Sequence, residues 1–291
     1  MTTWFSNWRA VFRIAARRRA QAAAGLLCAS LVQACALVEN YDDPDGPRYA
    51  AEFAPRTESA AGPLAELSVC SFNIELSEHI AEAIADLSGD EHLRTCSVIL
   101  LQEMDWPGAQ RIAEALAFDV VYYPGSVHSG KDFGNAVLSR WPILDDAKLI
   151  LPHRNPSNGR IRIAVRATLG VPFAPITVYS VHGDTPWLGA AGRLDQADAV
   201  AADASRLVGP VIVGGDFNTS DPGSVDSTVE RFTSRAFTWA TAAVPPSAGG
   251  PLGKSKIDHV FVKEFAVAGA GTVASDASDH QPIWVNLVVL H

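Results

Sequence analysis

The sequence has few cysteines, and half of them lie near its start. Of four in 291 residues, Cys28 and Cys35 fall in the apolar leader described below. Cys70 and Cys96 each begin an apolar pattern typical of a strand. They could form a bridge in an oxidising compartment, but buried free thiols fit this context better. No cysteine accompanies the acids and histidines of the motifs below, which argues against a zinc cluster.

Positive charge is scarce beyond the leader. The formal net charge is −9, and the first 35 residues contribute five arginines and no acids, so the remaining chain carries −14. Proteins usually hold polyanions on a basic face. A domain this acidic would need metal ions or a local basic stripe to hold duplex nucleic acid tightly.

Charged residues are absent from positions 20 to 38, directly after the cluster of arginines. This pattern resembles an export signal, and it is too rich in alanine and glutamine to make a strong membrane helix. The stretch "LVQAC" ending at Cys35 is similar to a bacterial lipoprotein cleavage box, although Gln33 stands where a smaller residue is commoner. We therefore expect residues 1–35 to be an export signal of lipoprotein type. Lipid anchoring through Cys35 in the cell envelope, simple cleavage with secretion, and an uncleaved anchor all stay open.

The rest of the chain predicts one domain after a linker. Residues 36–65 contain proline, glycine and acids without hydrophobic periodicity, which is typical of a flexible tether. Residues 66–291 have the length and the apolar content for one large core, and they contain no internal repeat. Beyond the tether, the only biased segment is "TAAVPPSAGGPLG", which we interpret as a loop.

Short apolar runs alternate with amphipathic segments from Leu67 onward. Helices are expected near 77–88, 107–117 and 188–207, and strands are more numerous than helices. Several neighbouring strands lack room for a crossover helix, which excludes a purely parallel sheet. The pattern predicts an α/β protein with two mixed sheets packed together and helices outside.

Polar residues stand at the ends of five apolar runs. They are Asn73, Glu103, His182, Asp216 with Asn218, and Asp279 with His280 just before the last strand. Carboxylates and amides at the tips of buried strands cost desolvation energy unless they are paired or metal-bound. Since strand ends gather side chains from distant sequence positions on a rigid edge, we expect these residues to share one site.

Seven ordered blocks resemble the endonuclease/exonuclease/phosphatase superfamily, which includes deoxyribonuclease I, exonuclease III, neutral sphingomyelinases and inositol polyphosphate 5-phosphatases. The blocks are "SFNIE", "LLQEMD", "GNAVLSRWPI", "VYSVHGD", "GGDFNTSDP", "KIDHVFV" and "SDHQPI", from residue 71 to residue 283. The resemblance implies a four-layer α/β sandwich like that of deoxyribonuclease I. It also implies a divalent-metal phosphohydrolase that acts on a nucleic acid, a lipid headgroup or a small phosphoester.

The resemblance also assigns roles to the residues at the strand ends. Asn73, Glu103 and Asp279 offer hard oxygen ligands for Mg²⁺, with Mn²⁺ or Ca²⁺ as alternatives. His280 resembles the general base, oriented by Asp258. The pair Asp216 and Asn218 resembles the residues that orient the attacking water and bind the phosphoryl oxygens.

Further residues are assigned less directly. His182 stands where exonuclease III-like repair enzymes carry tyrosine, so the repair-enzyme interpretation loses weight, and we expect His182 to act as the leaving-group acid. Arg162 resembles the phosphate-contacting arginine, with Arg160 as the alternative. Asn135 is either a phosphate or ligand-positioning amide or a turn residue at a strand start.

Other polar residues receive structural interpretations. His259 should face away from Asp258 on its strand. We interpret Asp184 as a loop acid and Trp187 as a packing aromatic, and His128 has no recognisable context.

We expect a monomeric phosphoric ester hydrolase, either a non-specific secreted nuclease or a lipid-headgroup phosphodiesterase of the sphingomyelinase kind. A non-catalytic binding module is a weaker alternative, because the Glu and His of the motifs are retained.

Overall fold

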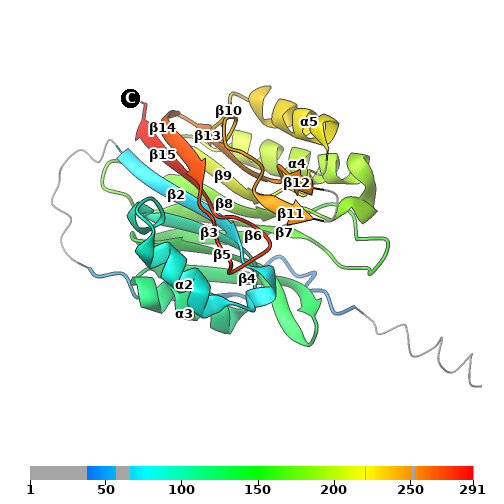
Figure 1. Cartoon of the computed structure of the whole chain (residues 1–291), viewed down its shortest axis with the longest axis horizontal. Helices are drawn as coiled ribbons and strands as arrows, with labels where there is room; N and C mark the ends of the chain where they lie inside the picture. The colour runs from blue at the N-terminus through cyan, green and yellow to red at the C-terminus, as the bar shows by residue number, and fades with distance from the viewer. Residues whose placement is uncertain (1–37, 57–65, 220, 251–252, 291) are drawn as a thin grey trace, which may run out of the picture. The chain divides into compact units, whose positions relative to one another are not determined.

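The computed structural model describes residues 38–56, 66–219, 221–250 and 253–290 (Figure 1). The chain divides into two units, Met1–Val38 and Glu39–His291. The predictions for the leader and for Cys35 lie outside the described residues. Among the described helices, none is long and apolar enough to cross a membrane. The second unit is the folded domain discussed below.

Two mixed sheets form the centre of the domain. The seven-stranded sheet has the spatial order β1 (Tyr49–Ala51), β4 (Asp119–His128), β5 (Lys131–Ser139), β3 (Val98–Met104), β2 (Glu66–Asn73), β15 (Ile283–Val289) and β14 (Phe265–Thr272). The six-stranded sheet has the order β10 (Thr238–Trp239), β13 (Asp258–Lys263), β9 (Val211–Asp216), β8 (Ile176–His182), β7 (Ile163–Leu169) and β6 (Ile143–Ile150). Each contains one parallel pair, β2 with β3 and β8 with β9, and the other described pairs are antiparallel. A separate hairpin joins β11 (Ala248–Gly250) and β12 (Gly253–Ser255).

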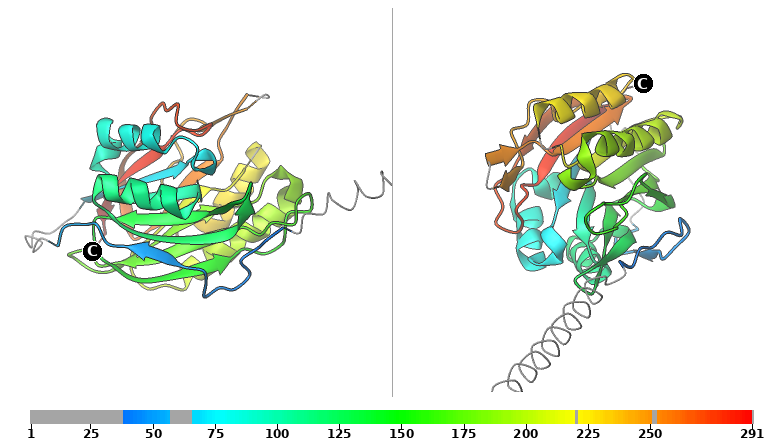
Figure 2. Two further views of the ribbon diagram at one scale, coloured as in Figure 1. Left: turned by 90° about the horizontal axis from the view of Figure 1, so that it is seen from below. Right: turned by 90° about the vertical axis from the view of Figure 1, so that its right-hand side faces the viewer.

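Helices cover the outer face of each sheet and complete four layers (Figure 2). The helices α2 (Ile80–Gly89) and α3 (Trp106–Leu116) flank the seven-stranded sheet, and α4 (Gly189–Ser205) and α5 (Pro222–Thr233) flank the six-stranded sheet. Short 3-10 helices span Glu75–Ser77, Leu93–Thr95 and Pro186–Leu188. Aspartates begin two of the helices: Asp105 accepts from the Gly108 N–H of α3, and Asp221 forms a capping box with Ser224 of α5. The predicted sandwich is confirmed, although α5 was not among the expected helices.

Alternation along the strands divides the apolar residues among three cores. Val69 of β2 faces the core between the sheets, while Phe72 of the same strand faces α2 and α3. In the same way, Val178 of β8 lies between the sheets and Tyr179 lies under α4 and α5. Successive side chains of a strand point to opposite faces, so strands buried on both faces appear as unbroken apolar runs. Cys70 and Cys96 are buried free thiols, as predicted.

Residues 39–56 differ from the expected flexible tether. The strand β1 pairs with the edge strand β4, and the Tyr41 N–H donates to the Gly125 carbonyl at 2.9 Å. Lys148 Nζ donates to the Tyr41 carbonyl at 2.9 Å and to the Gly46 carbonyl at 2.6 Å. An edge strand offers unpaired backbone groups, and this polar segment satisfies them without a hydrophobic pattern of its own. The remainder of the predicted tether, residues 57–65, lies outside the described residues.

Candidate active site

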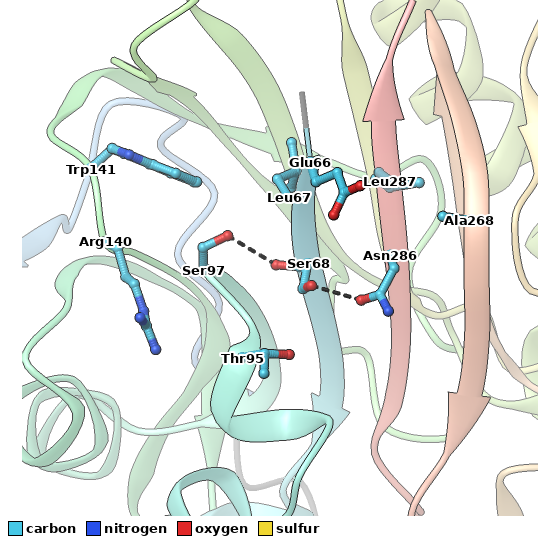
Figure 3. Close-up of a pocket in the computed structure, with 10 residues that line it drawn as sticks. All are labelled: Glu66, Leu67, Ser68, Thr95, Ser97, Arg140, Trp141, Ala268, Asn286 and Leu287. Atoms are coloured by element: carbon cyan, nitrogen blue, oxygen red, sulfur yellow. Dashed lines mark hydrogen bonds between the residues drawn. The ribbon is translucent and has the colours of Figure 1, made fainter. Parts of the chain in front are cut away.

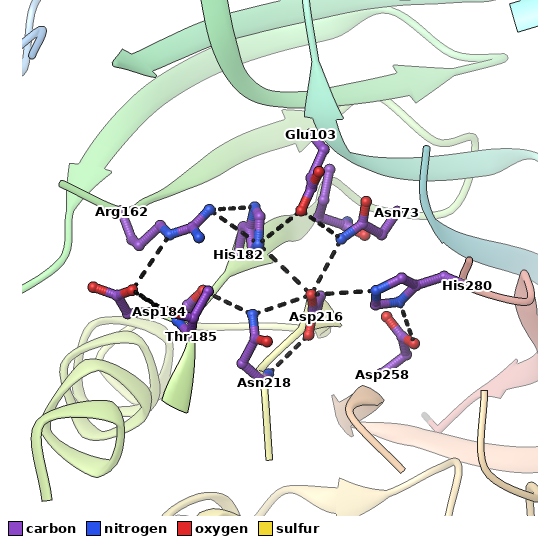
Figure 4. Close-up of polar contacts among 12 residues, drawn as sticks. Asn73, Glu103, Arg162, His182, Asp184, Thr185, Asp216, Asn218, Asp258 and His280 are labelled. Atoms are coloured by element: carbon purple, nitrogen blue, oxygen red, sulfur yellow. Dashed lines mark hydrogen bonds and ion pairs between the residues drawn. The ribbon is translucent and has the colours of Figure 1, made fainter. Parts of the chain in front are cut away.

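Strand register brings the polar strand ends together (Figure 4). Asn73 ends β2 opposite Gln102 of the parallel strand β3. Asp216 of β9 lies between its partners, opposite His182 in β8 and Asp258 in β13. Because both parallel pairs end at the same edge of the sandwich, the two sheets contribute to one site.

The backbone is unusual at three positions around this edge. Glu103 and Asn218 have φ values of 58° and 52°, in the left-handed region that residues other than glycine rarely adopt. The register between β3 and β5 shifts between Leu101 and Met104, a bulge that redirects the Glu103 side chain. A side chain at Gly215 would collide with the Val181 carbonyl, so the close approach of β9 to β8 requires glycine there. Such strain is typical of functional sites.

Asp216 is the centre of the hydrogen-bond network. Its carboxylate accepts from Asn73 Nδ2 at 3.1 Å, from the Asn218 N–H at 2.8 Å and from Asn218 Nδ2 at 3.2 Å. His182 Nε2 lies 3.6 Å from Asp216 Oδ2, and His280 Nε2 lies 3.8 Å from the same atom. Burial raises the pKa of Asp216 to about 7, against the opposing effect of His280.

His280 forms a buried pair with Asp258. The distance from His280 Nδ1 to Asp258 Oδ2 is 2.9 Å, and Ser247 Oγ donates to the same carboxylate oxygen at 2.5 Å. An ionised carboxylate only accepts hydrogen bonds, so Nδ1 carries the hydrogen and Nε2 faces Asp216. Burial would lower the pKa of His280, but the charge and hydrogen bond of Asp258, helped by Asp216 and Asp279, raise it to about 10.

Arg162 and His182 line the opposite side of Asp216. Arg162 Nη1 lies 3.1 Å from both ring nitrogens of His182, and Arg162 Nε lies 3.9 Å from Asp184 Oδ1. A guanidinium group only donates, so the ring accepts and is neutral. Burial, together with Arg162 and His280, lowers the pKa of His182 well below its usual value.

The predicted metal ligands lie around the same centre, but Asn73 turns its amide nitrogen toward it, and its Oδ1 accepts from the Glu75 N–H at 3.2 Å. Asn73 Nδ2 donates to Glu103 Oε1 at 3.3 Å, and Asp279 Oδ1 lies 3.9 Å from His280 Nε2. Four carboxylates, those of Glu103, Asp216, Asp258 and Asp279, surround this edge, and their excess negative charge fits a hard divalent cation. Asp216, Asp258 and His280 also offer ligand atoms within 4.8 Å of one another. Because Asp258 and His280 already bond to each other, that trio suits proton transfer better.

Of the residues considered for substrate binding, Arg162 contacts His182, whereas Asn135 and Arg160 have other partners. Asn135 is buried between the sheets, and its Nδ2 donates at 3.0 Å to the carbonyls of both Ile163 and Ser180. Both amide hydrogens are therefore occupied in joining strands, which departs from the predicted substrate contact. Arg160 Nη1 contacts His128 Nδ1 at 3.0 Å, whereas Arg162 contacts His182.

Sequence reasoning missed two residues of the site, and its interpretation of Trp187 is wrong. Asp184, expected to be an ordinary loop acid, is fully buried and faces Arg162; the buried arginine, which needs a counter-charge, was the available signal. Ser247 lies in the segment interpreted as a loop, and nothing local in the sequence links it to Asp258. Trp187 is not a packing aromatic, since it is 75% exposed. His259 is buried and contacts Thr219, in agreement with its structural interpretation.

Another pocket lies at the start of β2, whereas the site lies at its end (Figure 3). Ser97 Oγ donates to the Ser68 carbonyl at 3.2 Å, and Ser68 Oγ donates to Asn286 Oδ1 at 2.6 Å. These polar side chains satisfy one another, so this pocket offers no comparable set of acids and bases.

The fold and the site together define a phosphoric ester hydrolase of the deoxyribonuclease I type. The chain belongs to the Endonuclease/Exonuclease/phosphatase family, whose model matches residues 70–280. Members of this family hydrolyse phosphoric esters and typically depend on divalent metal ions, and the buried group of Asp216, Asp258 and His280 offers ligand atoms for one.

Solved structures share this fold. An endonuclease/exonuclease/phosphatase from Beutenbergia cavernae is 22% identical, with a TM-score of 0.61, over 78% of this chain and 72% of its own. D. rerio TDP2, solved with a single-strand DNA product, is 15% identical, with a TM-score of 0.61, over 77% and 99%. A mannosyl-6-phosphatase of Bacteroides thetaiotaomicron is 19% identical, with a TM-score of 0.58, over 76% and 99%. At these identities the likeness concerns the fold alone. No curated protein matches the sequence.

Proposed function

We propose that this protein hydrolyses a phosphodiester or phosphomonoester with Mg²⁺, by in-line attack of an activated water. The observation that carries the proposal is the position of Asp216. It is buried between His182 and His280, 3.6 and 3.8 Å from their Nε2 atoms, and Asn73 Nδ2 donates both to it and to Glu103 Oε1. Phosphate ester hydrolysis needs such a set: a group that takes a proton from water, donors for the phosphoryl oxygens, and oxygen ligands for a metal.

The proton-accepting side of the site consists of Asp216, Asp258 and His280. Asp258 holds the Nδ1–H of His280, which fixes the ring so that Nε2 faces the position of the attacking water. Asp216, whose Oδ2 lies 3.8 Å from the same Nε2, orients that water through its carboxylate. Bound Mg²⁺ would neutralise phosphoryl oxygens and offset the carboxylates that hold a proton on His280.

The opposite side suits phosphate binding. Arg162 is buried beside His182, and its guanidinium group can hold phosphoryl oxygens through charge-assisted hydrogen bonds. The neutral ring of His182 is a poor source of a full proton. We therefore replace the expected role of His182 as leaving-group acid with that of a hydrogen-bond donor to the phosphate, while Asn218 Nδ2 provides a further donor near Asp216.

The proposal for cellular location rests on the sequence. The run of arginines followed by the uncharged stretch 20–38 supports export, with anchoring through Cys35, secretion after cleavage, and an uncleaved anchor as the outcomes to separate. Mass spectrometry of the native N-terminus and lipid labelling of the Cys35→Ser variant distinguish them. Labelling that persists in the variant would exclude the lipid anchor at this residue.

Purified domain incubated with defined substrates tests the reaction. Plasmid DNA, sphingomyelin, bis-p-nitrophenyl phosphate and inositol phosphates should each be assayed with Mg²⁺ and with EDTA. We expect hydrolysis of at least one ester that stops with EDTA, and loss of that hydrolysis in the Asp216→Asn variant. Activity that is unaffected by EDTA, or that survives Asp216→Asn, would contradict the proposal.

A further inference from the structure

Asp184 is a buried acid with one satisfied and one unsatisfied carboxylate oxygen. Its Oδ1 accepts from Asn155 Nδ2 at 2.6 Å and from the Thr185 N–H at 2.7 Å, and it lies 3.9 Å from Arg162 Nε. Among the described residues, Oδ2 has no hydrogen-bond partner, although the side chain is fully buried. A buried carboxylate of this kind costs free energy unless a cation compensates its charge. The ion pair with Arg162 therefore explains how an acid can be buried here.

Two amide side chains fix Asp184 in place. Asn155 is buried, and its Oδ1 accepts from the Ser157 N–H at 2.9 Å, so its Nδ2 is the group that faces the carboxylate. Gln196 of α4 accepts the Asp184 N–H at 2.8 Å, and its Nε2 donates to the Pro152 carbonyl at 2.9 Å. The loop that contains Asn155 and the helix α4 thus hold both the side chain and the backbone of Asp184.

Arg162 lies between Asp184 and His182 (Figure 4). Beyond the ring of His182 stand two acids of the proposed catalytic centre, since His182 Nε2 is 3.6 Å from Glu103 Oε1 and 3.6 Å from Asp216 Oδ2. A guanidinium group forms strong, directed hydrogen bonds with carboxylates. Without a counter-charge behind it, Arg162 would be drawn toward these acids, where it would occupy the position of the phosphate.

The position of Arg162 also decides which nitrogen of His182 carries the hydrogen. Nε2 faces the carboxylates of Glu103 and Asp216, which accept when ionised, whereas Arg162 only donates. Nδ1 therefore accepts from Arg162, and the hydrogen is on Nε2. This is the arrangement that a donated contact from His182 to a phosphoryl oxygen requires.

We infer that Asp184 is a positioning residue, which holds Arg162 toward the phosphate and away from Glu103 and Asp216, and that Asn155 holds Asp184. The inference rests on the proposed function and adds to it the groups that keep the phosphate side assembled before substrate binds. Asp184 acts through Arg162 and touches no reacting atom. Donors that are held in advance lose less entropy when an anion arrives.

Calorimetric binding of inorganic phosphate, with Mg²⁺ present, tests the inference without turnover. Asp184→Asn keeps the size of the side chain and removes its charge. Removal of a negative charge should by itself strengthen the binding of an anion. If Asp184 positions Arg162, phosphate binding should instead weaken by about 10-fold or more. The KM for the ester that the protein hydrolyses should change in the same direction.

Arg162→Gln supplies the background that separates positioning from packing. In that background, Asp184→Asn should change phosphate affinity by less than about twofold, because the group that it positions is gone. An equal loss in both backgrounds would overturn the inference. It would show that Asp184 acts through packing or through Arg193, whose pKa burial lowers and the charges of Asp221 and Asp184 raise.

The tautomer of His182 gives a second readout, from ring-nitrogen NMR shifts. We expect the hydrogen on Nε2 in the wild type and a mixture of both tautomers in Asp184→Asn. Because the wild-type spectrum needs no variant, it tests the inference even if Asp184→Asn does not fold. In that case Asn155→Ala, which leaves the charge in place, should still weaken phosphate binding.

Asp195→Asn is the matched control, since it removes the same charge from a surface pair of α4 with His153 at 2.8 Å. It should leave phosphate affinity within about twofold of the wild type. Unchanged or tighter phosphate binding in Asp184→Asn, or a hydrogen on Nδ1 of His182 in the wild type, overturns the inference. The expected phosphate results without hydrolysis of any ester would instead contradict the proposed function.

Discussion

Glu103 combines an unfavourable backbone conformation with a side chain at the centre of the chemistry. Its φ of 58° and the bulge beside it turn the carboxylate toward Asn73 and His182. Left-handed backbone at a residue other than glycine costs on the order of 1–3 kcal/mol. The fold retains this cost at a position where the carboxylate can serve as a metal ligand.

At this residue we predict that Glu103→Gln removes most activity, by a factor on the order of 10² or more, since a neutral amide binds Mg²⁺ weakly. Initial rates over a Mg²⁺ titration measure the effect. Glu114→Gln, which changes an exposed acid of α3, is the control. Near-normal turnover of Glu103→Gln at saturating Mg²⁺ would contradict its role as a principal ligand.

The pair of His280 and Asp258 should behave as one unit. His280→Ala is expected to lower kcat on the order of 10²-fold or more, the usual scale for a positioned acid or base. Asp258→Asn should cost a similar order because it favours the wrong tautomer. Steady-state kinetics of the double variant should be scarcely worse than those of His280→Ala alone. Multiplicative losses would show that the two residues act independently.

His182 provides a test of phosphate binding against proton donation. A neutral ring beside Arg162 that holds a phosphoryl oxygen matters for every leaving group. We therefore expect His182→Ala to impair a p-nitrophenyl ester and a natural ester by similar factors, on the order of 10². Comparison of kcat/KM on the two substrates decides the matter. A much smaller loss on the p-nitrophenyl ester would restore the role of leaving-group acid.

At the scale of elements, Ser247 and Ala248, at the start of β11, hold the turn that contains His280. The Gln281 N–H donates to the Ser247 carbonyl at 2.6 Å, and Ala248 forms a bridge with His280. The Ser247 hydroxyl donates to Asp258 at 2.5 Å from the same segment. A stretch that looks like an irregular loop in the sequence is therefore the support of the His280 and Asp258 pair.

Ser247 should consequently act as a positioning residue. Ser247→Ala is expected to lower kcat about 10-fold with little change in KM, since it removes a hydrogen bond to a buried carboxylate. Ser247→Thr, which keeps the hydroxyl group, should restore most of the rate. In the Asp258→Asn background the alanine substitution should have little further effect. Equal losses for alanine and threonine would indicate a packing role instead.

At the scale of the whole molecule, polar contacts between the two sheets hold the site together. Gln102 Nε2 of β3 donates to Ser180 Oγ of β8 at 3.0 Å, and Ser180 Oγ donates to the Leu101 carbonyl at 2.8 Å. Together with Asn135, these buried groups connect the sheets beneath Glu103 and His182. Since a buried polar group costs free energy when unpaired, these contacts restrict how the sheets can slide.

Acid sensitivity of the folded domain is predicted from His259. Thr219 Oγ1 uses its hydrogen on the Lys256 carbonyl at 2.7 Å, so His259 Nε2 donates to Thr219 at 2.8 Å. Nδ1 is then buried without a described partner, and burial lowers the pKa of His259 to about 4. Between about pH 6.5 and 4 the unfolded chain binds a proton that the folded chain does not, so this residue contributes about 3 kcal/mol of stability that acid removes.

Urea unfolding at a series of pH values between about 7 and 4.5 measures this contribution. His259→Gln keeps a donor for Thr219 and removes the titrating group, so its free energy of unfolding should fall less steeply with acid than that of the wild type. His79→Gln, at an exposed position before α2, is the control and should retain the wild-type slope. Parallel pH profiles for wild type and His259→Gln would contradict the assignment.

The sequence by itself determined the two-sheet architecture and the location of the site at strand ends. Alternating and unbroken apolar runs depend on backbone geometry that repeats along the chain, so their pattern can be recognised locally. Acids, amides and histidines at strand tips are costly to bury unless they pair with one another or bind a metal ion. Asn73, Glu103, Asp216 and His280 could therefore be singled out before any contact was known.

Only the tertiary structure decided which side chains meet. Asp184 faces Arg162, Ser247 faces Asp258, and Arg160 faces His128 across separations that no local pattern records. The packing of residues 39–56 depends in the same way on unpaired groups at the distant edge strand β4. Local preference indicates which face of an element a side chain occupies, but the partner across that face is set by how the sheets and loops assemble. The support of the site follows from that assembly.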